Sequence, residues 1–386
     1  MTALQNRGQV AIVLHAHLPY VRARETSERV EEQWLYEALW ESYLPLLGVI
    51  ERAAEQAGAP RLTISLSPPL LSMLRDAHYA RGFEAFTSRL SDICERATRD
   101  DRLAPAALDH RARLDDARKR WGGARRDVPR AFADLATGGA IELTTTAATH
   151  AFLPAVLTPA AVRAQLRLGR RYFRSTTGLT PGGLWLPECG YDERLAADVA
   201  ASGARWVVLE EHGVDLAKPR PAGAPFAPIV SPEGVAVFGR AAELVGRVWS
   251  SARGYPGHAA YREFHRDLAD VAPGLVGDGW IGPTGIRPFS VTGATADKAP
   301  YAPDRARGMI AEHAHDFVRR IDAALGQSSQ RAPLAVLAFD AELFGHWWWE
   351  GPAFLEAVLA LLGERAISLG AYLERDPELE VAEPRT

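Results

Sequence analysis

Seven short apolar segments, each ending at polar residues, most strongly constrain the fold of this chain. Strands of a parallel sheet that helices cover on both faces are continuous apolar runs of this kind, whereas half-exposed strands alternate between apolar and polar residues. We therefore expect a mainly parallel sheet. The seven expected strands are residues 10–14, 62–66, 141–146, 184–186, 206–209, 235–238 and 334–339.

Helical patterns lie between these runs. Thr158-Pro159 is typical of an N-cap followed by proline in the first helical turn, and Gly203 follows the end of another helical pattern. Alternating strands and helices predict the α/β class. A closed α/β barrel and an open doubly wound sheet both place their sites at the carboxyl ends of the strands, so both architectures remain open at this point. The main helical patterns are residues 31–56, 158–174, 192–201 and 303–325.

Three stretches depart from the alternation. Residues 77–132 are rich in Arg, Asp and Ala with helical spacing, which predicts a helical insertion. Residues 250–301 are rich in Gly and Pro, and long irregular segments of this kind are often lids or binding loops. Residues 352–373 predict one or two amphipathic helices before a charged tail.

The composition excludes several classes of function. A net charge of −4 provides no basic field for nucleic acid or an anionic membrane. The two cysteines, Cys94 and Cys189, are far apart and show no metal or redox spacing, which favours a reducing cytoplasm. The first apolar run, residues 10–14, is too short for a signal peptide or a membrane span. We therefore expect a cytoplasmic protein.

Two carboxylates follow expected strands and are candidates for catalysis. Glu188 comes after Leu184-Trp185-Leu186-Pro187, and Asp340 comes directly after the last apolar run. Two carboxyl groups that flank a glycosidic bond are the usual requirement of sugar cleavage. Glu342 alternates with Asp340 and would face the same way if the strand continued. Cys189 has no partner motif for a nucleophile and is interpreted as a small buried residue.

Aromatic residues gather near the second carboxylate. The chain has ten tryptophans, and three of them, Trp347, Trp348 and Trp349, directly follow His346. This segment predicts a stacking wall for a carbohydrate, since tryptophan rings cover the apolar faces of sugars. The alternative for each ring is ordinary burial in the core.

His15 and His17 lie two residues apart at the end of the first strand, so their side chains project to the same side. Imidazole nitrogens bind zinc and also bind hydroxyl groups. From the residues alone, a metal site, a sugar-binding role and a buried structural role all remain open for this pair.

Four motifs occur in an order that resembles glycoside hydrolase family 57, and within it the bacterial and archaeal 1,4-α-glucan branching enzymes. Together they span residues 10–351. They are His15-Ala16-His17-Leu18-Pro19-Tyr20, Glu142-Leu143 with Ala148-Thr149-His150-Ala151-Phe152-Leu153-Pro154, Trp185-Leu186-Pro187-Glu188-Cys189-Gly190-Tyr191, and Phe339-Asp340-Ala341-Glu342-Leu343-Phe344-Gly345-His346-Trp347-Trp348.

The resemblance implies an incomplete seven-stranded (β/α) barrel over residues 1–350 and a retaining mechanism on glycogen or amylose-like α-glucans, without a metal or organic cofactor. By motif, Glu188 is the implied nucleophile and Asp340 the implied general acid/base. His15, His17 and His150 are the implied sugar-binding residues, which favours that role for the histidine pair. Further substrate-contact candidates are Trp34, Tyr255, Trp280, His346 and Trp347.

The resemblance weakens at the C-terminus. The family's branching enzymes continue beyond the Asp340 motif into a helical domain, whereas this sequence ends at Thr386. We therefore interpret residues 351–386 as the remnant of that domain. An α-amylase or 4-α-glucanotransferase of the same family, a catalytically impaired glucan-binding protein, and a metal-dependent deacetylase-like enzyme using His15 and His17 remain as alternatives to branching.

Overall fold

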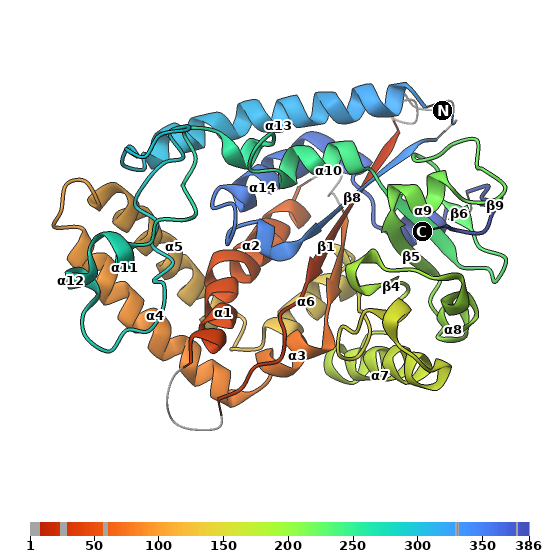
Figure 1. The fold of residues 1–386 in the computed structure, drawn as a ribbon, viewed down its shortest axis with the longest axis horizontal. Coiled ribbons are helices and arrows are strands. Elements are labelled where there is room, and N and C mark those ends of the chain that lie inside the picture. Colours follow the sequence, from red (N-terminus) through yellow and green to blue (C-terminus); the bar gives the residue numbers. More distant parts are fainter. Residues whose placement is uncertain are drawn as a thin grey trace.

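The computed structural model describes residues 8–23, 29–56, 61–328, 330, 332–375 and 377–385. Seven parallel strands curl almost into a barrel in the order β3-β2-β1-β8-β7-β5-β4 (Figure 1). All seven predicted strands are confirmed, and the α/β class with them. The strands are β1 (Gln9–Ala16), β2 (Leu62–Leu66), β3 (Ile141–Thr144), β4 (Leu184–Trp185), β5 (Trp206–Glu210), β7 (Ala236–Arg240) and β8 (Leu334–Asp340).

The barrel closes incompletely. The two ends of the strand order, β3 and β4, meet at an isolated bridge between Thr145 and Leu184, where the Trp185 N–H donates to the Thr145 carbonyl at 2.9 Å. The rest of this seam carries no ladder among the described residues, which confirms the incomplete (β/α)7 barrel. Because the strands run parallel, their carboxyl ends lie at one rim.

Helices cover the outside of the barrel, and their ends follow the sequence signals. In α7 (Pro159–Thr177) the Thr158 side chain accepts the Ala161 N–H, and the helix ends at Gly178 with a φ of 77°. Long helix α13 (Pro303–Gly326) crosses the top of Figure 1 above α14 (Gly351–Leu362). The other helices on the barrel are α3 (Pro68–Leu74), α8 (Ala196–Ala201), α9 (Glu211–Asp215), α10 (Ala242–Trp249) and α15 (Leu369–Leu373).

The stretch predicted as an insertion, residues 77–132, is helical. It forms α4 (Ala77–Ala97), α5 (Ala104–Gly123) and the start of α6 (Val128–Thr137). Figure 1 shows α4 and α5 at the left, beside the short helices α11 (Leu268–Val271) and α12 (Pro273–Val276). Apolar residues spaced along α4 face the core, as expected for an amphipathic helix.

The N-terminal helical pattern contains a π-helical turn. Helix α1 (Val30–Ala38) continues through Leu39–Tyr43 in π geometry into α2 (Leu44–Ala54). Such turns often occur at functional sites because they redirect side chains within a helix. Here the turn directs Glu41, Ser42 and Tyr43 toward the segment after β8.

The segment after α14 closes the barrel at its amino end. Leu369 N–H donates to the Thr63 hydroxyl, and Gly370 N–H donates to Glu142 Oε2 at 2.7 Å. Glu142 also accepts from Trp206 Nε1 at 3.1 Å. The Glu142 carboxylate therefore joins β3 and β5 to the segment after α14. This motif residue has a structural role.

Two very short strands were not predicted. β6 (Ile229–Val230) pairs antiparallel with β7, and β9 (Glu380–Val381) pairs with β6. Two-residue strands carry too little periodicity for prediction from sequence. None of the described helices is both long and apolar enough to cross a membrane. The interpretation of residues 351–386 as a domain remnant remains a prediction.

Candidate active site

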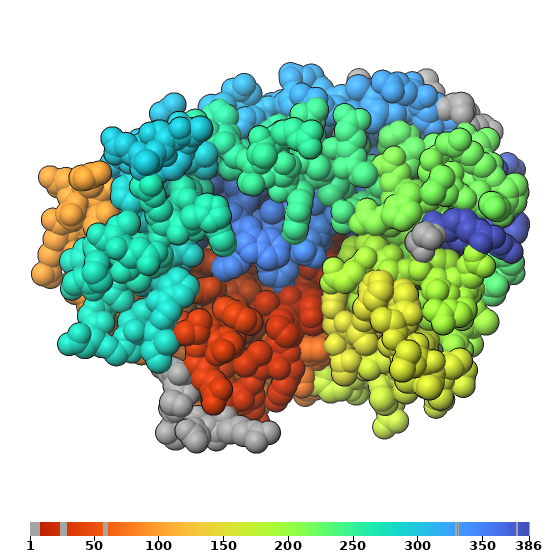
Figure 2. Space-filling view, viewed as in Figure 1, coloured from red at the N-terminus to blue at the C-terminus, as the bar shows by residue number. Residues whose placement is uncertain are grey.

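The strand register brings the motif residues to one level of the barrel. On β1, His15 pairs with Ser65 of β2 on one side and with Asp340 of β8 on the other. The carboxyl end of β4 leads directly into the turn that carries Glu188. Figure 2 shows the segment that follows β8, in royal blue, in a depression between the red N-terminal helices and the green segments. The strand-end residues thus converge at one rim.

Three histidines form a stacked cluster. His15 Nε2 lies 2.8 Å from His150 Nε2, and the rings of His17 and His150 stack with centroids 3.8 Å apart. The outer nitrogens are also engaged: His15 Nδ1 lies 3.1 Å from the Ser65 hydroxyl, and His17 Nδ1 lies 2.8 Å from the Ser67 hydroxyl. The structure therefore brings His15, His17 and His150 together, with rings held by serine hydroxyls.

The environment keeps these imidazoles neutral. Burial and then the neighbouring His150 lower the pKa of His17 to about 3, and burial lowers the pKa of His150 to about 4. The pKa of His15 is also well below its usual value, mainly because the ring is buried. Neutral imidazole offers one donor and one acceptor, a combination that suits sugar hydroxyls. In the described parts of the chain, no group of three or more His, Cys, Asp or Glu side chains is arranged to hold a metal ion.

The turn that carries Glu188 is tightly constrained. Glu188 has a φ of 56° and Cys189 a φ of 52°, a left-handed conformation that is uncommon for residues other than glycine. Trp185, just before the turn, stacks on His15 with centroids 4.8 Å apart. A Cβ at Gly190 would lie 2.2 Å from the Phe152 ring, so this exposed ring lies against the turn. The exposed Glu188 carboxylate is thereby presented beside an aromatic surface.

Asp340 and Glu188 are close enough to influence each other. Burial, and secondly the charge of Glu188, raise the pKa of Asp340 to about 6, while Arg240 opposes this shift. Arg240 itself pairs with Glu210 at 3.1 Å. A carboxyl group whose pKa is raised by burial and by a neighbouring carboxylate is typical of an acid/base catalyst.

The Cys189 thiol is buried between these charges. Burial and the charges of Glu210, Asp340 and Glu188 raise the pKa of Cys189 to about 12. A thiol that holds its proton at neutral pH is a poor nucleophile. This agrees with the interpretation of Cys189 as a small buried residue.

Glu342 does not face the site beside Asp340. β8 ends at Asp340 and a 3-10 turn (Ala341–Leu343) follows, so the expected alternation stops there. The Glu342 carboxylate instead accepts the Tyr43 hydroxyl and the His17 N–H. Burial raises its pKa to about 8. Glu342 therefore joins the π-helical turn to the loop that carries His17.

Of the three tryptophans predicted to form an aromatic wall, Trp347 alone is exposed. Trp348 and Trp349 are almost completely buried, so their assignment to a wall was wrong. Trp347 is 39% exposed and packs edge-on against Trp249, which is 46% exposed. His346 Nδ1 contacts Glu41 Oε2 at 2.5 Å, which binds that ring to the π-helical turn. A Cβ at Gly345 would lie 1.7 Å from the Glu41 carbonyl oxygen, so only glycine allows this close approach.

The structure places Tyr255 against helices α13 and α14. Its ring is buried among His313, Phe317 and Phe354, and its hydroxyl donates to Asp316 at 2.8 Å. The side chain therefore packs within the protein. A substrate contact for Tyr255 stays a prediction.

Trp34 and Trp280 lie on neighbouring elements. Trp34 is 44% exposed on α1, and the loop glycine Gly282 packs against Val30 of the same helix. Trp280 packs on Phe86 of α4, and Arg89 lies over its ring. Both remain predicted substrate contacts.

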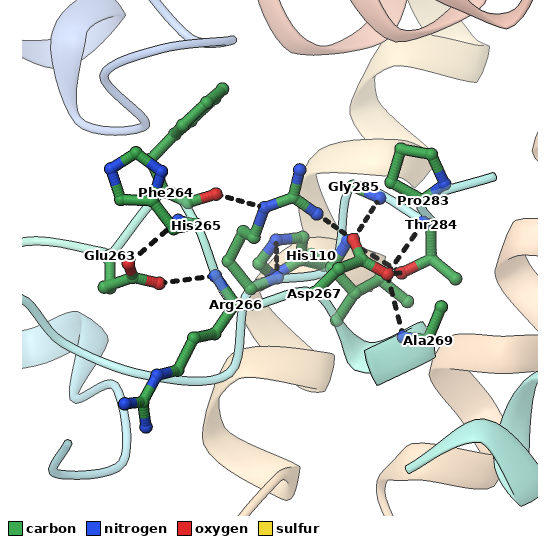
Figure 3. A network of polar contacts seen from close by, with 12 residues as sticks. His110, Glu263, Phe264, His265, Arg266, Asp267, Ala269, Pro283, Thr284 and Gly285 are labelled. Atoms are coloured by element: carbon green, nitrogen blue, oxygen red, sulfur yellow. Dashed lines mark hydrogen bonds and ion pairs between the residues drawn. The ribbon is translucent and has the colours of Figure 1, made fainter. Parts of the chain in front are cut away.

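The Gly- and Pro-rich segment 250–301 is folded around a buried carboxylate. Asp267 accepts the N–H groups of Ala269, Thr284 and Gly285 at 2.8 to 2.9 Å and pairs with Arg287 (Figure 3). Arg287 also donates to the Phe264 carbonyl. These bonds hold the centre of the segment together, and Arg96 of α4 joins the segment to the helical insertion by donating to the Leu275 and Val276 carbonyls.

Several site residues were not singled out from the sequence. Arg240 and Glu210 are the last residues of β7 and β5, one or two residues beyond the predicted strands, so their position after those strands was an available signal. Phe152 lies within a quoted motif, two residues after His150. For Tyr43 and Trp249 the sequence carried no comparable signal, because each reaches its partner through long-range packing.

Comparison with known proteins gives consistent matches. The family model Glycosyl hydrolase family 57 matches residues 11–375. A 1,4-alpha-glucan branching enzyme of Thermococcus kodakarensis is 31% identical over 95% of this chain, which spans 58% of that enzyme's length. The crystal structure of the alpha-amylase AmyC from Thermotoga maritima is 32% identical with a TM-score of 0.90, covering 98% of this chain and 76% of that one.

The crystal structure of a branching enzyme is also similar to this chain. The GH57-type branching enzyme from Pyrococcus horikoshii is 30% identical with a TM-score of 0.87, covering 98% of this chain and 72% of that one. The family model extends over nearly the whole barrel and includes all four motifs. This chain therefore belongs to glycosyl hydrolase family 57.

Proposed function

We propose that this protein is a retaining α-glucan enzyme that cleaves 1,4-α-glucan and forms α-1,6 branches in glycogen-like polymers. The observation that carries the proposal is the pair Glu188 and Asp340, in which burial and the charge of Glu188 raise the pKa of Asp340 to about 6. An acid with such a pKa is suited to exchanging a proton near neutral pH. The relatives that are named branching enzymes support the choice of reaction.

In the proposed first step, Glu188 attacks the anomeric carbon of a glucose unit while Asp340 gives its proton to the departing glycosidic oxygen. The bond between the anomeric carbon and that oxygen breaks, and a covalent glucosyl-Glu188 ester forms. The neutral imidazoles of His17 and His150 hold the hydroxyl groups of this sugar, and His15, whose Nε2 lies 2.8 Å from His150 Nε2, orients the His150 ring. Phe152 and Trp347 offer exposed ring faces for neighbouring sugars.

In the second step, the Asp340 carboxylate accepts the proton of a 6-hydroxyl group from another glucan chain. The oxygen of that hydroxyl attacks the anomeric carbon, and the ester bond to Glu188 breaks. If water attacks in place of the hydroxyl group, the same site hydrolyses the chain. The acceptor therefore decides between branching and hydrolysis.

An α-amylase is the second candidate function. The AmyC structure has a TM-score of 0.90 against this chain, and the branching enzyme from P. horikoshii has one of 0.87, so both activities occur among close structural neighbours. A glucan-binding protein without turnover remains the alternative from another class.

Incubation with amylose separates these functions. We expect wild-type protein to lower iodine absorbance and create α-1,6 linkages with little gain in reducing ends, whereas an amylase raises reducing ends. Glu188→Gln should remove the reaction, and Glu243→Gln, an exposed carboxylate on α10, is the matched control. Binding of amylose without any turnover by the wild type would contradict the enzymatic proposal.

A further inference from the structure

A cavity of about 700 Å³ opens between α3 and α7 at the rim of the barrel. Its walls come from Tyr20 in the loop after β1, from Pro68 and Pro69 at the start of α3, and from the outer face of α7. This volume is within the usual range of about 300 to 1,000 Å³ for small-molecule sites. The catalytic carboxylates are not among the residues that line it.

The cavity is lined in part by chain neighbours of the histidine cluster. Thr149 lines it and directly precedes His150, whose Nε2 contacts His15. Pro68 lines it and directly follows Ser67, whose hydroxyl lies 2.8 Å from His17 Nδ1. Thr149 and Pro68 therefore lie in the chain segments that carry or support the histidines, which places this wall of the cavity beside the cluster.

One face of α7 supplies four of the side chains that line the cavity. Leu168, Arg171, Tyr172 and Ser175 follow helical spacing and all line the cavity. The opposite face of α7, with Leu166 and Phe173, is buried in the protein core. The helix thus has a second, partly exposed face, which folding of the barrel does not require.

The lining suits a neutral, hydroxylated polymer. Tyr20 is 51% exposed and Leu168 is 53% exposed, which leaves apolar surface open to solvent at this point. Hydroxyl groups of Ser72, Thr149 and Ser175 are interspersed with these surfaces, and none of the described lining residues is acidic. Sugar rings present apolar C–H faces to aromatic rings and hydroxyl groups to polar side chains.

We infer that this cavity binds a stretch of α-glucan beyond the sugars at Glu188 and Asp340, so that the enzyme selects long chains. The inference rests on the proposed function, because it assigns the same polymer to a remote site. Short oligosaccharides reach the histidine cluster without filling the cavity, whereas long chains fill both. Binding energy from the cavity is therefore available to long chains alone.

Calorimetric binding in a Glu188→Gln background tests this inference without turnover. The probes are maltotriose and maltodecaose. Leu168→Arg places a long charged side chain in the cavity at an exposed position, and Tyr172→Ala removes a ring. We expect each variant to weaken maltodecaose binding by about five- to tenfold and to change maltotriose binding by less than about twofold.

Two controls accompany these variants. Tyr172→Phe keeps the ring and should retain long-chain affinity, and Arg167→Ala changes an exposed α7 residue that does not line the cavity. Thermal melting identifies any loss of fold in Tyr172→Ala, and Leu168→Arg leaves the core face intact.

The outcomes separate the two proposals. Equal losses for both oligosaccharides, or no loss for maltodecaose, would overturn the remote site while leaving the proposed function intact. If the Glu188→Gln parent binds neither oligosaccharide and wild-type protein leaves amylose unchanged, the proposed function fails and the inference fails with it.

Discussion

The Nε2 atoms of His15 and His150 lie 2.8 Å apart. At this distance one imidazole donates an N–H and the other accepts through an unprotonated nitrogen. Protonation of both rings would set two N–H groups against each other. Burial prevents this near neutral pH, because it lowers the pKa of His150 to about 4 and that of His15 well below its usual value.

Replacing His150 tests this contact. His150 has a φ of 54°, and asparagine tolerates this region well, so His150→Asn isolates loss of the ring from backbone strain. We expect a loss of about 1 to 3 kcal/mol in the free energy of unfolding, because the buried His15 nitrogen loses its partner. Glucan affinity should fall as well. Urea unfolding measures the loss in the free energy of unfolding. His212→Ala, on the exposed surface of α9, is the control. Equal stability of wild type and His150→Asn would contradict the account.

The pH dependence of kcat/KM should follow Asp340. The free enzyme needs this group protonated for the first step, and burial together with the charge of Glu188 raises its pKa to about 6. The rate constant kcat/KM should therefore fall as the pH rises above about 6, by about tenfold per unit well above it.

The effect of the Glu188 charge on the pKa of Asp340 can also be measured without turnover. Because the Glu188 charge raises the pKa of Asp340, the uncharged Glu188→Gln should lower it. Titration of the labelled Asp340 carboxyl by NMR measures this shift, with Glu243→Gln as control. An Asp340 pKa that is the same in Glu188→Gln and wild type would mean that the two carboxyls do not interact.

Glu342 should make the protein less stable in alkaline solution. Burial raises its folded-state pKa to about 8, above the ordinary value of 4.5. The folded state therefore holds a proton that the unfolded chain releases, and the stabilisation from this group is present below about pH 4.5 and is lost as the pH rises through 8. Glu342→Gln keeps an uncharged acceptor for Tyr43 and should lose less stability between pH 6 and 9. Parallel pH profiles for wild type and Glu342→Gln, measured by urea unfolding, would count against this account.

The strained turn predicts a trade between stability and activity. Glu188 has a φ of 56°, a conformation that glycine adopts without steric cost. Glu188→Gly should therefore raise the free energy of unfolding by about 1 kcal/mol while abolishing turnover. Glu188→Gln, which keeps a side chain at this position, should lose activity without the gain. A Glu188→Gly variant no more stable than Glu188→Gln would show that the turn carries no strain.

The parallel sheet could be predicted from the sequence because its strands are buried on both faces, whereas its incomplete barrel form was implied by the family resemblance alone. Runs such as residues 10–14 and 334–339 have no polar alternation, and the residues at their carboxyl ends, His15 and Asp340, are site candidates on sequence grounds alone. The parallel register then explains why these two residues pair at one level.

The errors have a common physical origin. Glu342 was expected to face the same way as Asp340 if the strand continued, but β8 ends at Asp340 and the Glu342 carboxylate accepts from Tyr43 of the π-helical turn. Trp348 and Trp349 were expected in a wall, but packing against distant helices buries them. The spacing of residues in the sequence shows which side chains share a face only as long as the strand or helix continues. Packing against distant parts of the chain decides where that strand or helix ends.

Trapping the covalent intermediate tests the central claim, that Glu188 is the nucleophile. An Asp340→Ala variant lacks the base for the second step, and an α-maltosyl fluoride needs no acid for the departure of fluoride. Intact-mass measurement should show protein that is heavier by one maltosyl group, and peptide mapping should locate this group on Glu188. Attachment to another residue, or no adduct while fluoride is released, would contradict the account.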